Sequence, residues 1–450
     1  MESVQLLVVG GGLAGVEAAW AAAGRGVRVI LLEMRPVRGT AVHRTGDLAE
    51  LVCSNSLKSR LITNASGVLK EEMRLLGSVV LAAAERHAVS AGEALAVDRE
   101  AFAREVTQLL ESHPLISVRR EEVRHIPRHR PLVLATGPLT THELARELQA
   151  YTGEKSLAFF DAVAPTVTLE SIDLSRVFRA SRRKRGQADG DAPGDDYLNC
   201  PMDREQYRSF WREIVAAEVA QPHNPEDAET PFFEMCLPIE ELAKRGEQTL
   251  AYGPMRPVGL IDPRTGRRPY AVVQLRQENK AGTLWGLVGF QTRLKWGEQK
   301  RIFRMIPGLE NADFVRYGVV HRNIYVSAPR VLELGLQVRG HPGLFLAGQI
   351  TGVEGYLESA AMGLLAGINC LRWAHGLPPV EPPEQTVMGS LCRYLRETDP
   401  DRFAPMNANF GILPEPCVPV RGKREKALYK AEQALQAMRA FAEQIGCCGS

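Results

Sequence analysis

Two glycine-rich phrases near opposite ends of this 450-residue chain constrain its fold most strongly. The first, GGGLAG at residues 10–15, follows an apolar stretch at 4–9 and leads into small and apolar residues at 13–20. A strand, a glycine turn and a helix in this order bind the pyrophosphate of a dinucleotide, because the helix N-terminus offers unpaired N–H groups. We therefore predict a phosphate-binding turn made of Gly10, Gly11, Gly12, Leu13, Ala14 and Gly15.

A second predicted strand, at residues 27–33, ends in the acid Glu33 about twenty residues past the glycines. A carboxylate at this position can accept hydrogen bonds from a ribose hydroxyl group. The glycine pattern alone is a weak signal, but strand, helix and acid in register predict a dinucleotide site. The alternative is a glycine-rich turn without a ligand.

The far end of the chain discriminates between NAD, FAD and S-adenosylmethionine, which similar turns can bind. Two apolar stretches, at residues 131–137 and 343–349, close in ATG and AGQ, as in FAD proteins. There the late strand brings the flavin to the N-terminus of a last helix, expected here at 357–367. The predicted FAD site therefore adds Gly137, Gly348, Gln349 and Gly352. Gln349 replaces the usual acid and brings no charge.

The order of the predicted elements gives the fold class. Strands and helices alternate up to about Tyr151, whereas residues 165–318 mix one helix, proline-rich turns and two strands. We predict an α/β protein with a discontinuous Rossmann-like FAD-binding domain of the glutathione-reductase type and an inserted α+β domain. The division places the flavin domain at 1–165 and 316–450 and the insert at 166–315.

Composition limits the function classes. A hydrophobic fraction of 45% with 24% charged residues is typical of a globular protein, and no stretch predicts a membrane span or a signal peptide. The eight cysteines form no CxxC and no His/Cys ligand spacing, so we expect neither a metal site nor a dithiol reductase. A reduced, cytoplasmic protein is the simplest expectation. The sequence identifies no protein partner.

Positive charge is clustered although the net charge is only +2. One cluster alternates with aromatic residues and contains Arg293, Lys295, Lys300 and Arg301. A solvated face is the ordinary interpretation of such a cluster. Because three basic clusters occur, we expect a phosphate-bearing partner, with these four residues as RNA-binding candidates.

Two cysteines lie in unusual settings. Cys53 is followed by Ser-Asn-Ser, whose donors could stabilise a thiolate, and Cys236 precedes Pro238, which suits the start of a short helix. The residues alone favour a plainer interpretation, in which each cysteine is a small buried side chain.

Longer phrases identify a family. AELVCSNSLKS, NCPMD, GPMRPVGL, RPYAVVQLRQEN, LVGFQTRLKWGEQKRIFRMIPGLENA and AGQITGVEGYLESAAMGLLAGIN, with GGGLAG, span nearly the whole chain. They resemble the folate- and FAD-dependent tRNA uracil-5-methyltransferases (TrmFO), relatives of the GidA-type tRNA-modifying flavoproteins. The chain departs at Met235, Leu48 and Val16, where small, phenylalanine and serine residues are expected. None of these removes a reacting atom.

The resemblance implies methylation of C5 of uridine 54 in the tRNA T-loop, with methylenetetrahydrofolate as carbon donor and NADH or NADPH as reductant of the flavin. A thiolate adds at uracil C6, the resulting enolate attacks the one-carbon unit, and an exocyclic methylene then accepts hydride from the reduced flavin. The resemblance assigns Cys53 and Cys236 to catalysis. We favour Cys236 as nucleophile and Cys53 as base, and expect at least one lowered thiol pKa.

Folate candidates follow from the same resemblance. His321 is the expected ring partner of the pterin, and Glu354 and Tyr356 could contact flavin or pterin, with loop capping as the alternative. Two rival functions stay open: a GidA-like enzyme that installs a different group on RNA, and an RNA-folding factor in which FAD is only structural.

Overall fold

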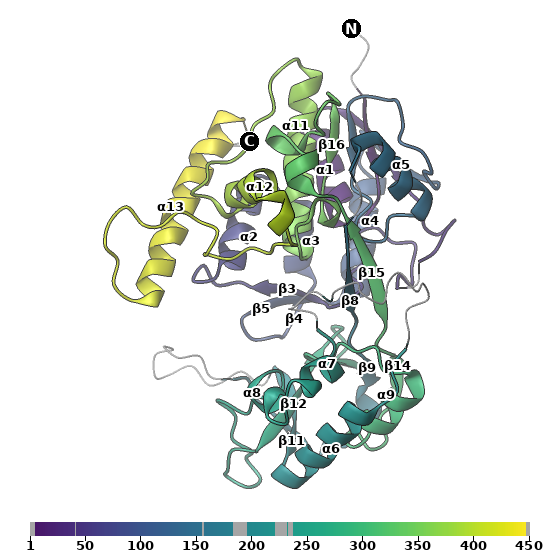
Figure 1. The fold of residues 1–450 in the computed structure, drawn as a ribbon, viewed down its shortest axis with the longest axis vertical. Helices are drawn as coiled ribbons and strands as arrows, with labels where there is room; N and C mark the ends of the chain where they lie inside the picture. Colours follow the sequence, from purple (N-terminus) through teal and green to yellow (C-terminus); the bar gives the residue numbers. More distant parts are fainter. Residues whose placement is uncertain are drawn as a thin grey trace.

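The computed structural model describes residues 5–40, 42–154, 157–182, 196–220, 232 and 237–446. Two lobes stand one above the other, and an antiparallel ribbon joins them (Figure 1). Strands β8 (Leu157–Ala162) and β15 (Val320–Tyr325) form this ribbon, with His321 paired to Asp161.

The upper lobe is built on a five-stranded sheet in the order β16-β7-β1-β2-β6. Its strands are β1 (Gln5–Val9), β2 (Arg28–Glu33), β6 (Ile116–Arg120), β7 (Leu132–Leu134) and β16 (Leu344–Leu346). All pairs are parallel, and the late strand β16 lies beside β7 with Leu344 opposite Leu132. The strands β7 and β16 are buried at every position, as parallel strands covered on both faces require, whereas the edge strand β6 is buried only at Ile116. Both ends of the chain therefore build one sheet, as the sequence predicts.

Two glycines explain how the first and last helices of this sheet meet. Helix α1 (Leu13–Ala23) packs on α11 (Tyr356–Ala374) (Figure 1). A Cβ atom on Gly363 would lie 2.1 Å from the carbonyl oxygen of Ala14, and one on Gly367 would lie 2.5 Å from that of Ala18. Only glycine allows this approach of two backbones, which fixes the C-terminal helix against the phosphate-binding turn.

The other elements of the upper lobe surround this sheet and share its hydrophobic core. The helices are α2 (Ala65–Leu75), α3 (Val79–Arg86), α4 (Arg99–Glu111), α5 (His142–Thr152), α10 (Ala328–Val331), α12 (Val387–Glu397) and α13 (Lys423–Gln444). A small antiparallel sheet in the order β3-β5-β4 comprises β3 (Ser56–Ser59), β4 (Ala88–Val89) and β5 (Ala94–Val97).

The lower lobe has a separate core under an antiparallel sheet in the order β10-β11-β12-β13-β9-β14. The strands are β9 (Thr166–Thr168), β10 (Phe178–Arg179), β11 (Tyr197–Met202), β12 (Ala271–Gln277), β13 (Leu284–Leu287) and β14 (Phe314–Arg316). The helices are α6 (Arg204–Ala216), α7 (Ile239–Lys244), α8 (Thr249–Tyr252) and α9 (Trp296–Phe303). The α/β fold with an α+β insert is as predicted. The domain limits at 165/166 and 315/316 stay our proposal.

Among the described residues, no helix combines the length and apolar character that crossing a membrane requires.

Candidate functional site

A cavity of about 410 Å³ opens at the carboxyl edge of the parallel sheet, where α1 and α11 begin. Segments from both ends of the chain and from the joining ribbon line it. Of the residues predicted from the sequence, the cavity walls contain Gly10, Gly12, Leu13, Ala14, Glu33, Cys53, Gly137, His321, Gly348, Gln349, Glu354 and Tyr356. The predicted cofactor, folate and Cys53 sites therefore converge on one space.

Three of the predicted glycines do not line the cavity but pack directly behind the residues that do. Gly11 donates its backbone N–H to Glu33 Oε2 at 2.7 Å. A Cβ atom on Gly15 would lie 1.7 Å from the carbonyl oxygen of Gly10, and one on Gly352 would lie 2.5 Å from the ring of Phe403. These residues allow close packing around the turn and do not line the cavity.

Gly12 shows that the turn is shaped for a ligand. Its φ of −74° is open to any residue, and a Cβ atom there would meet no protein atom within 4 Å. The protein itself does not need glycine at this position. Because Gly12 lines the cavity at the N-terminus of α1, the free space and the unpaired N–H groups fit the pyrophosphate of FAD.

Glu33 is held as a carboxylate at the tip of β2. Its oxygens accept hydrogen bonds from Gly11 N and from the backbone N and Nε of Arg35, at 2.7, 2.9 and 2.8 Å. Burial raises the pKa of this carboxyl group, but the Arg35 charge and these hydrogen bonds outweigh it, so the net pKa is lowered. A charged acceptor at the ribose position of a dinucleotide is the predicted arrangement.

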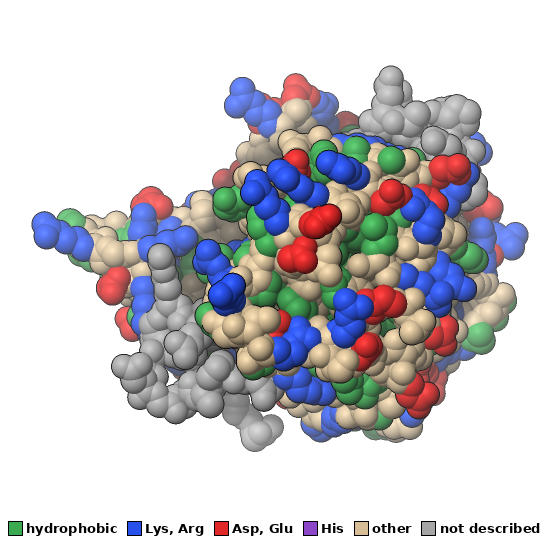
Figure 2. Space-filling model, turned by 90° about the horizontal axis from the view of Figure 1, so that it is seen from below, with side chains coloured by type: hydrophobic (Ala, Val, Ile, Leu, Met, Phe, Trp, Pro, Cys, Tyr) green, Lys and Arg blue, Asp and Glu red, His purple; other side chains and the backbone are tan. Residues whose placement is uncertain are grey.

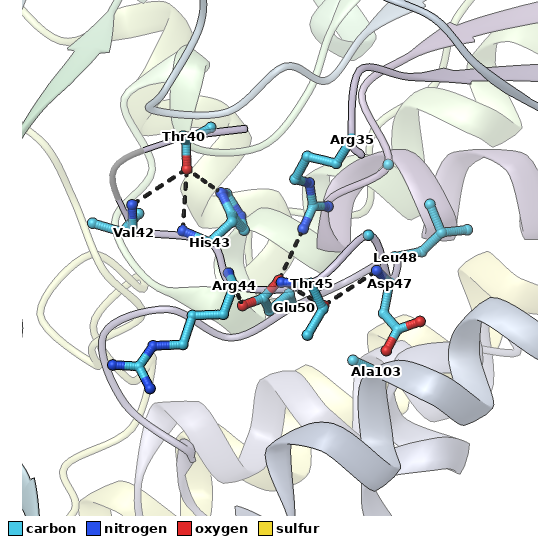
Figure 3. Close-up of polar contacts among 12 residues, drawn as sticks. Arg35, Thr40, Val42, His43, Arg44, Thr45, Asp47, Leu48, Glu50 and Ala103 are labelled. Atoms are coloured by element: carbon cyan, nitrogen blue, oxygen red, sulfur yellow. Dashed lines mark hydrogen bonds and ion pairs between the residues drawn. The ribbon is translucent and has the colours of Figure 1, made fainter. Parts of the chain in front are cut away.

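A loop between β2 and β3 forms another wall, and Glu50 organises it (Figure 3). Its carboxylate accepts hydrogen bonds from Arg35 Nη1, the backbone N–H groups of Arg44 and Thr45, and the Thr45 hydroxyl group, at 2.8–3.1 Å. This places the side chain of His43 at the cavity. The sequence analysis did not identify Glu50 or His43, although Glu50 opens the phrase that contains Cys53.

The hydrogen bonds of Thr40 indicate that the imidazole ring of His43 is neutral and carries its proton on Nε2, where it can act as a donor. The Thr40 hydroxyl oxygen accepts from the backbone N–H groups of His43 and Val42 at 3.1 and 3.4 Å and lies 2.7 Å from His43 Nδ1. The hydroxyl proton is therefore free to bond Nδ1, which leaves the ring proton on Nε2. Burial, followed by the charge of Arg35, lowers the pKa of His43 to about 4.

Cys53 lies beside Tyr356, the first residue of α11. The sulfur is 3.0 Å from the tyrosine oxygen, which also accepts the N–H groups of Cys53 and Ser54 at 2.8 and 3.3 Å. Burial raises the pKa of the Cys53 thiol to about 12, and the charge of Asp161 adds to this effect. The expected lowering of a thiol pKa therefore does not occur at Cys53, because burial and the Asp161 charge outweigh the hydrogen bond with Tyr356.

Three buried or half-buried arginines fix the loop that carries Cys53, and sequence reasoning missed all of them. Arg99 of α4 donates to the carbonyl oxygens of Leu51 and Val52, and Arg316 of β14 donates to that of Val52 at 3.0 Å. Arg276 of β12 donates to Asn55 Oδ1 and Ser54 Oγ, both at 2.8 Å. Arg276 and Arg316 come from the lower lobe, so the lower lobe positions the Cys53 loop.

Glu354 and His321 face the same space. Gln349 donates from Nε2 to Glu354 Oε2. Burial and the charge of Asp161 raise the pKa of Glu354 well above its usual value. His321 Nε2 lies 3.8 Å from Asp161 Oδ2, and burial lowers the His321 pKa although Asp161 opposes this. The raised pKa of Glu354 and the lowered pKa of His321 both favour the uncharged forms, which suit contact with an uncharged ring.

Cys236 lies outside the described residues. Phe232 forms a bridge with Phe160, the residue before Asp161 of the cavity wall, and Pro238 caps α7.

Three of the four RNA-binding candidates are paired with carboxylates. Arg293 pairs with Glu241, Lys295 with Glu218 at 2.6 Å, and Arg301 with Glu298 at 2.8 Å and with Glu213 at 2.5 Å. Lys300 is exposed and has no ion pair among the described residues. Figure 2 shows Lys and Arg side chains interspersed with Asp and Glu on the face seen from below.

No group of three or more His, Cys, Asp or Glu side chains in the described part of the chain is arranged to hold a metal ion.

Comparisons with known proteins agree with this geometry. The family profile described as glucose inhibited division protein A matches residues 5–378. The chain is 58% identical over 443 residues to "Methylenetetrahydrofolate--tRNA-(uracil-5-)-methyltransferase TrmFO" of Symbiobacterium thermophilum, covering 98% of both chains. It is 57% identical over 442 residues to the protein of the same name from Desulforudis audaxviator, covering 98% of this chain and 99% of that one.

Among solved structures, GidA of Aquifex aeolicus superposes with a TM-score of 0.69 at 16% identity, covering 99% of this chain and 74% of that chain. This likeness supports the fold.

Proposed function

The chain belongs to the GidA family and, within it, to the TrmFO group, and from this membership we propose that it methylates C5 of uridine 54 in the T-loop of tRNA. The general activity is that of a methylenetetrahydrofolate-dependent tRNA (uracil-5-)-methyltransferase. The observation that carries the proposal is the single cavity in which the glycine turn, Glu33 and Cys53 meet.

FAD fits this cavity. Gly12 and its neighbours in the turn would hold the pyrophosphate, Glu33 the ribose, and Gly137, Gly348 and Gln349 the remainder of the cofactor. When bound and reduced by NADH or NADPH, the flavin supplies the hydride that converts a methylene carbon on uracil into a methyl group.

The two cysteines have separate tasks in the proposal. The Cys236 thiolate adds to C6 of uracil, which makes C5 nucleophilic towards the one-carbon unit. After C5 has attacked the one-carbon unit, Cys53 removes the proton from C5, which expels the carrier of that unit and leaves a methylene carbon on C5. Once hydride has been transferred to this carbon, elimination at C6 restores the double bond and frees the Cys236 sulfur. Because Cys53 is a thiol in the structure, substrate binding must lower its pKa before it can act as base. The hydroxyl group of Tyr356 lies where it can donate to the sulfur and stabilise the thiolate.

The folate ring is assigned to the side of the cavity formed by His321, Glu354 and Tyr356. The lowered pKa of His321 favours a neutral ring, and the raised pKa of Glu354 favours a carboxyl group that keeps its proton and can donate it to a carbonyl or ring nitrogen. Tyr356 also contacts Cys53, so folate and the reacting sulfur would lie close together.

The target uridine must leave its stack in a folded RNA to reach this cavity, at a cost of a few kcal/mol. Phosphate contacts with the lower lobe would offset part of this cost, and Lys300 is the candidate that has no ion pair among the described residues. A tRNA substrate places the proposed activity in the cytoplasm.

The position of methylation tests the proposal. The holoenzyme is incubated with methylenetetrahydrofolate, NADPH and an unmodified tRNA transcript, or with a transcript that differs only by cytidine at position 54. We expect 5-methyluridine in the first transcript and none in the second. Equal product from both transcripts, or a different modified nucleoside, would favour the GidA-like rival. Absence of any product would favour a binding role.

A further inference from the structure

A series of aromatic rings runs from the core of the lower lobe to its surface. Phe303, which is fully buried, lies with its ring 6.4 Å from that of Phe314. Phe314 stacks on Tyr317 at 5.5 Å and 18°, and Tyr317 stacks on Trp296 at 5.5 Å and 15°. The outermost ring is therefore supported from behind by rings anchored in the core, and its orientation is set before any ligand arrives.

Trp296 keeps one face of its indole ring open. Its first face is covered by Tyr317, yet 62% of the residue is exposed. Among the described residues, the other strongly exposed aromatic side chain is Tyr252, at 79%, and it stacks on no described ring.

The stack is linked to the loop of the reacting cysteine. Tyr317 directly follows Arg316, whose Nη1 donates to the carbonyl oxygen of Val52 at 3.0 Å, and Val52 precedes Cys53. The hydrogen bond between Arg316 and Val52 therefore connects the two features: Tyr317, which supports the Trp296 ring, follows Arg316, and Cys53 follows Val52.

A second link starts from another part of the β2–β3 loop, at Arg44. The exposed side chain of Arg44 points away from Glu50 (Figure 3), and both of its Nη atoms lie 3.3 Å from the carbonyl oxygen of Val315. Arg44 follows His43, which lines the cavity, and Val315 lies two residues before Tyr317. A cation thus lies between the cavity and the aromatic stack.

We propose that Trp296 is the stacking platform for an unpaired base of the tRNA next to the nucleotide that enters the cavity. The inference rests on the proposed function and names a contact of the same site. Extracting one base from a loop leaves its neighbour with an uncovered face, and an aromatic ring can cover that face whatever the base is. A ring that is already fixed loses little freedom on binding, and Arg44 lies where the intervening phosphate would pass.

The competing explanation is that Trp296 only covers the apolar edge of the lower lobe. In that case replacing it changes stability and leaves RNA affinity unchanged. The stacking role predicts a change in the Kd for tRNA, whereas the covering role predicts a change in Tm alone.

The test compares Trp296→Ala, Trp296→Phe and Tyr252→Ala as flavin-loaded proteins. Binding of a labelled tRNA transcript is measured by fluorescence anisotropy at several salt concentrations, together with flavin content and Tm. We expect Trp296→Ala to raise Kd about 5- to 150-fold, the range for loss of one base stack, without changing the slope of log Kd against log salt. Trp296→Phe should recover most of the affinity, and Tyr252→Ala should bind like the wild type.

An unchanged Kd in Trp296→Ala would overturn the platform, as would an equal loss in Tyr252→Ala. A smaller salt slope in Trp296→Ala would also overturn it, because that result indicates a lost phosphate contact. The wild-type protein separates this outcome from failure of the proposed function. If the wild type methylates tRNA but the variants give one of these contradicting results, the role of Trp296 is wrong and the proposed function stands. If the wild type neither binds nor methylates tRNA, the proposed function fails first.

Discussion

The hydroxyl oxygen of Tyr356 lies 3.0 Å from the sulfur of Cys53. Two backbone N–H groups already occupy its acceptor sites, so the tyrosine proton is directed at the sulfur. Cys53 belongs to the N-terminal part of the chain, whereas Tyr356 begins the helix that follows the last strand of the parallel sheet. This contact therefore connects the N-terminal and C-terminal parts of the flavin domain directly at the Cys53 sulfur.

Cys53 should ionise only at high pH in the protein without substrates. Burial and the Asp161 charge raise its pKa to about 12, so it is a thiol at pH 8 and becomes a thiolate only as the pH approaches that value. Iodoacetamide should therefore label Cys53 slowly at pH 8 and progressively faster above pH 10, as followed by peptide mass spectrometry. The exposed Cys417 is an internal control for the reagent. Rapid labelling of Cys53 at pH 7 would contradict the buried, hydrogen-bonded geometry.

Alanine at two neighbouring glycines should separate cofactor binding from folding. At Gly12 a methyl group meets no protein atom but projects into the cavity, so Gly12→Ala should lose flavin and change the stability of flavin-free protein by no more than about 1 kcal/mol. At Gly15 the methyl group would lie 1.7 Å from a backbone oxygen, so Gly15→Ala should cost about 1–3 kcal/mol or more.

Flavin absorbance per mole of protein and urea unfolding of the flavin-free variants measure both effects. A Gly12→Ala protein that keeps its flavin would show that the turn does not hold the cofactor.

Glu33→Gln should weaken flavin binding and destabilise the protein by about 3 kcal/mol, because Arg35 loses a buried partner and keeps only Glu50. The pKa of Glu33 is lowered in the folded protein, so its contribution is complete above its ordinary value of 4.5 and is lost as the pH falls through the lower folded value.

The difference in stability between the wild type and Glu33→Gln should thus be constant from pH 5 to 7 and shrink in stronger acid. Urea unfolding at a series of pH values measures it. A difference that already disappears near pH 6 would be inconsistent with a paired carboxylate.

Arg276→Met should lower kcat at least tenfold while flavin content stays unchanged, because it frees Ser54 and Asn55 beside the reacting cysteine without touching the glycine turn. Arg208→Met is the matched control, since Arg208 is an ion-paired arginine elsewhere on the lower lobe. Methylation rates at saturating tRNA and hydrogen exchange of residues 51–57 provide the measurement. Unchanged hydrogen exchange of residues 51–57 would show that Arg276 does not position the Cys53 loop, and normal kcat with a loosened loop would show that this positioning does not limit catalysis.

Lys300→Ala should weaken tRNA binding more than Arg301→Ala. Lys300 has no ion pair in the described part of the chain, so removing its charge should reduce the salt slope by about 1, whereas Arg301 is already paired with Glu213 and Glu298. Titration of tRNA at several salt concentrations compares the two variants. Equal affinity of Lys300→Ala and the wild type would reject this lysine as a phosphate contact.

The parallel sheet and the glycine turn could be predicted because their signals are local. The strand before Gly10, the acid at Glu33 and the second glycine phrase at Gly348 each follow from a few consecutive residues and from the chemistry of a dinucleotide. The structure brings these phrases together as that chemistry requires.

The surroundings of Cys53 could not be predicted, since they depend on residues far apart in the chain. Arg276 and Arg316 reach the Cys53 loop from strands of the other lobe, and nothing beside them in the sequence marks this role. The same limit affected the basic cluster of α9. Lys295 looks unpaired in the sequence because Glu218 lies on another segment, and the second partner of Arg301, Glu213, lies on α6. The shift of the Cys53 pKa likewise follows from burial, which only the fold reveals.

The source of the transferred carbon tests the account most directly. Undermethylated tRNA is incubated with the holoenzyme and NADPH, with the label either on the methylene carbon of methylenetetrahydrofolate or on the methyl group of S-adenosylmethionine, and nucleosides are then separated. The account predicts label in 5-methyluridine from the folate alone, and none with Gly12→Ala protein that lacks flavin. Label arriving from S-adenosylmethionine, or from folate with flavin-free protein, would contradict it.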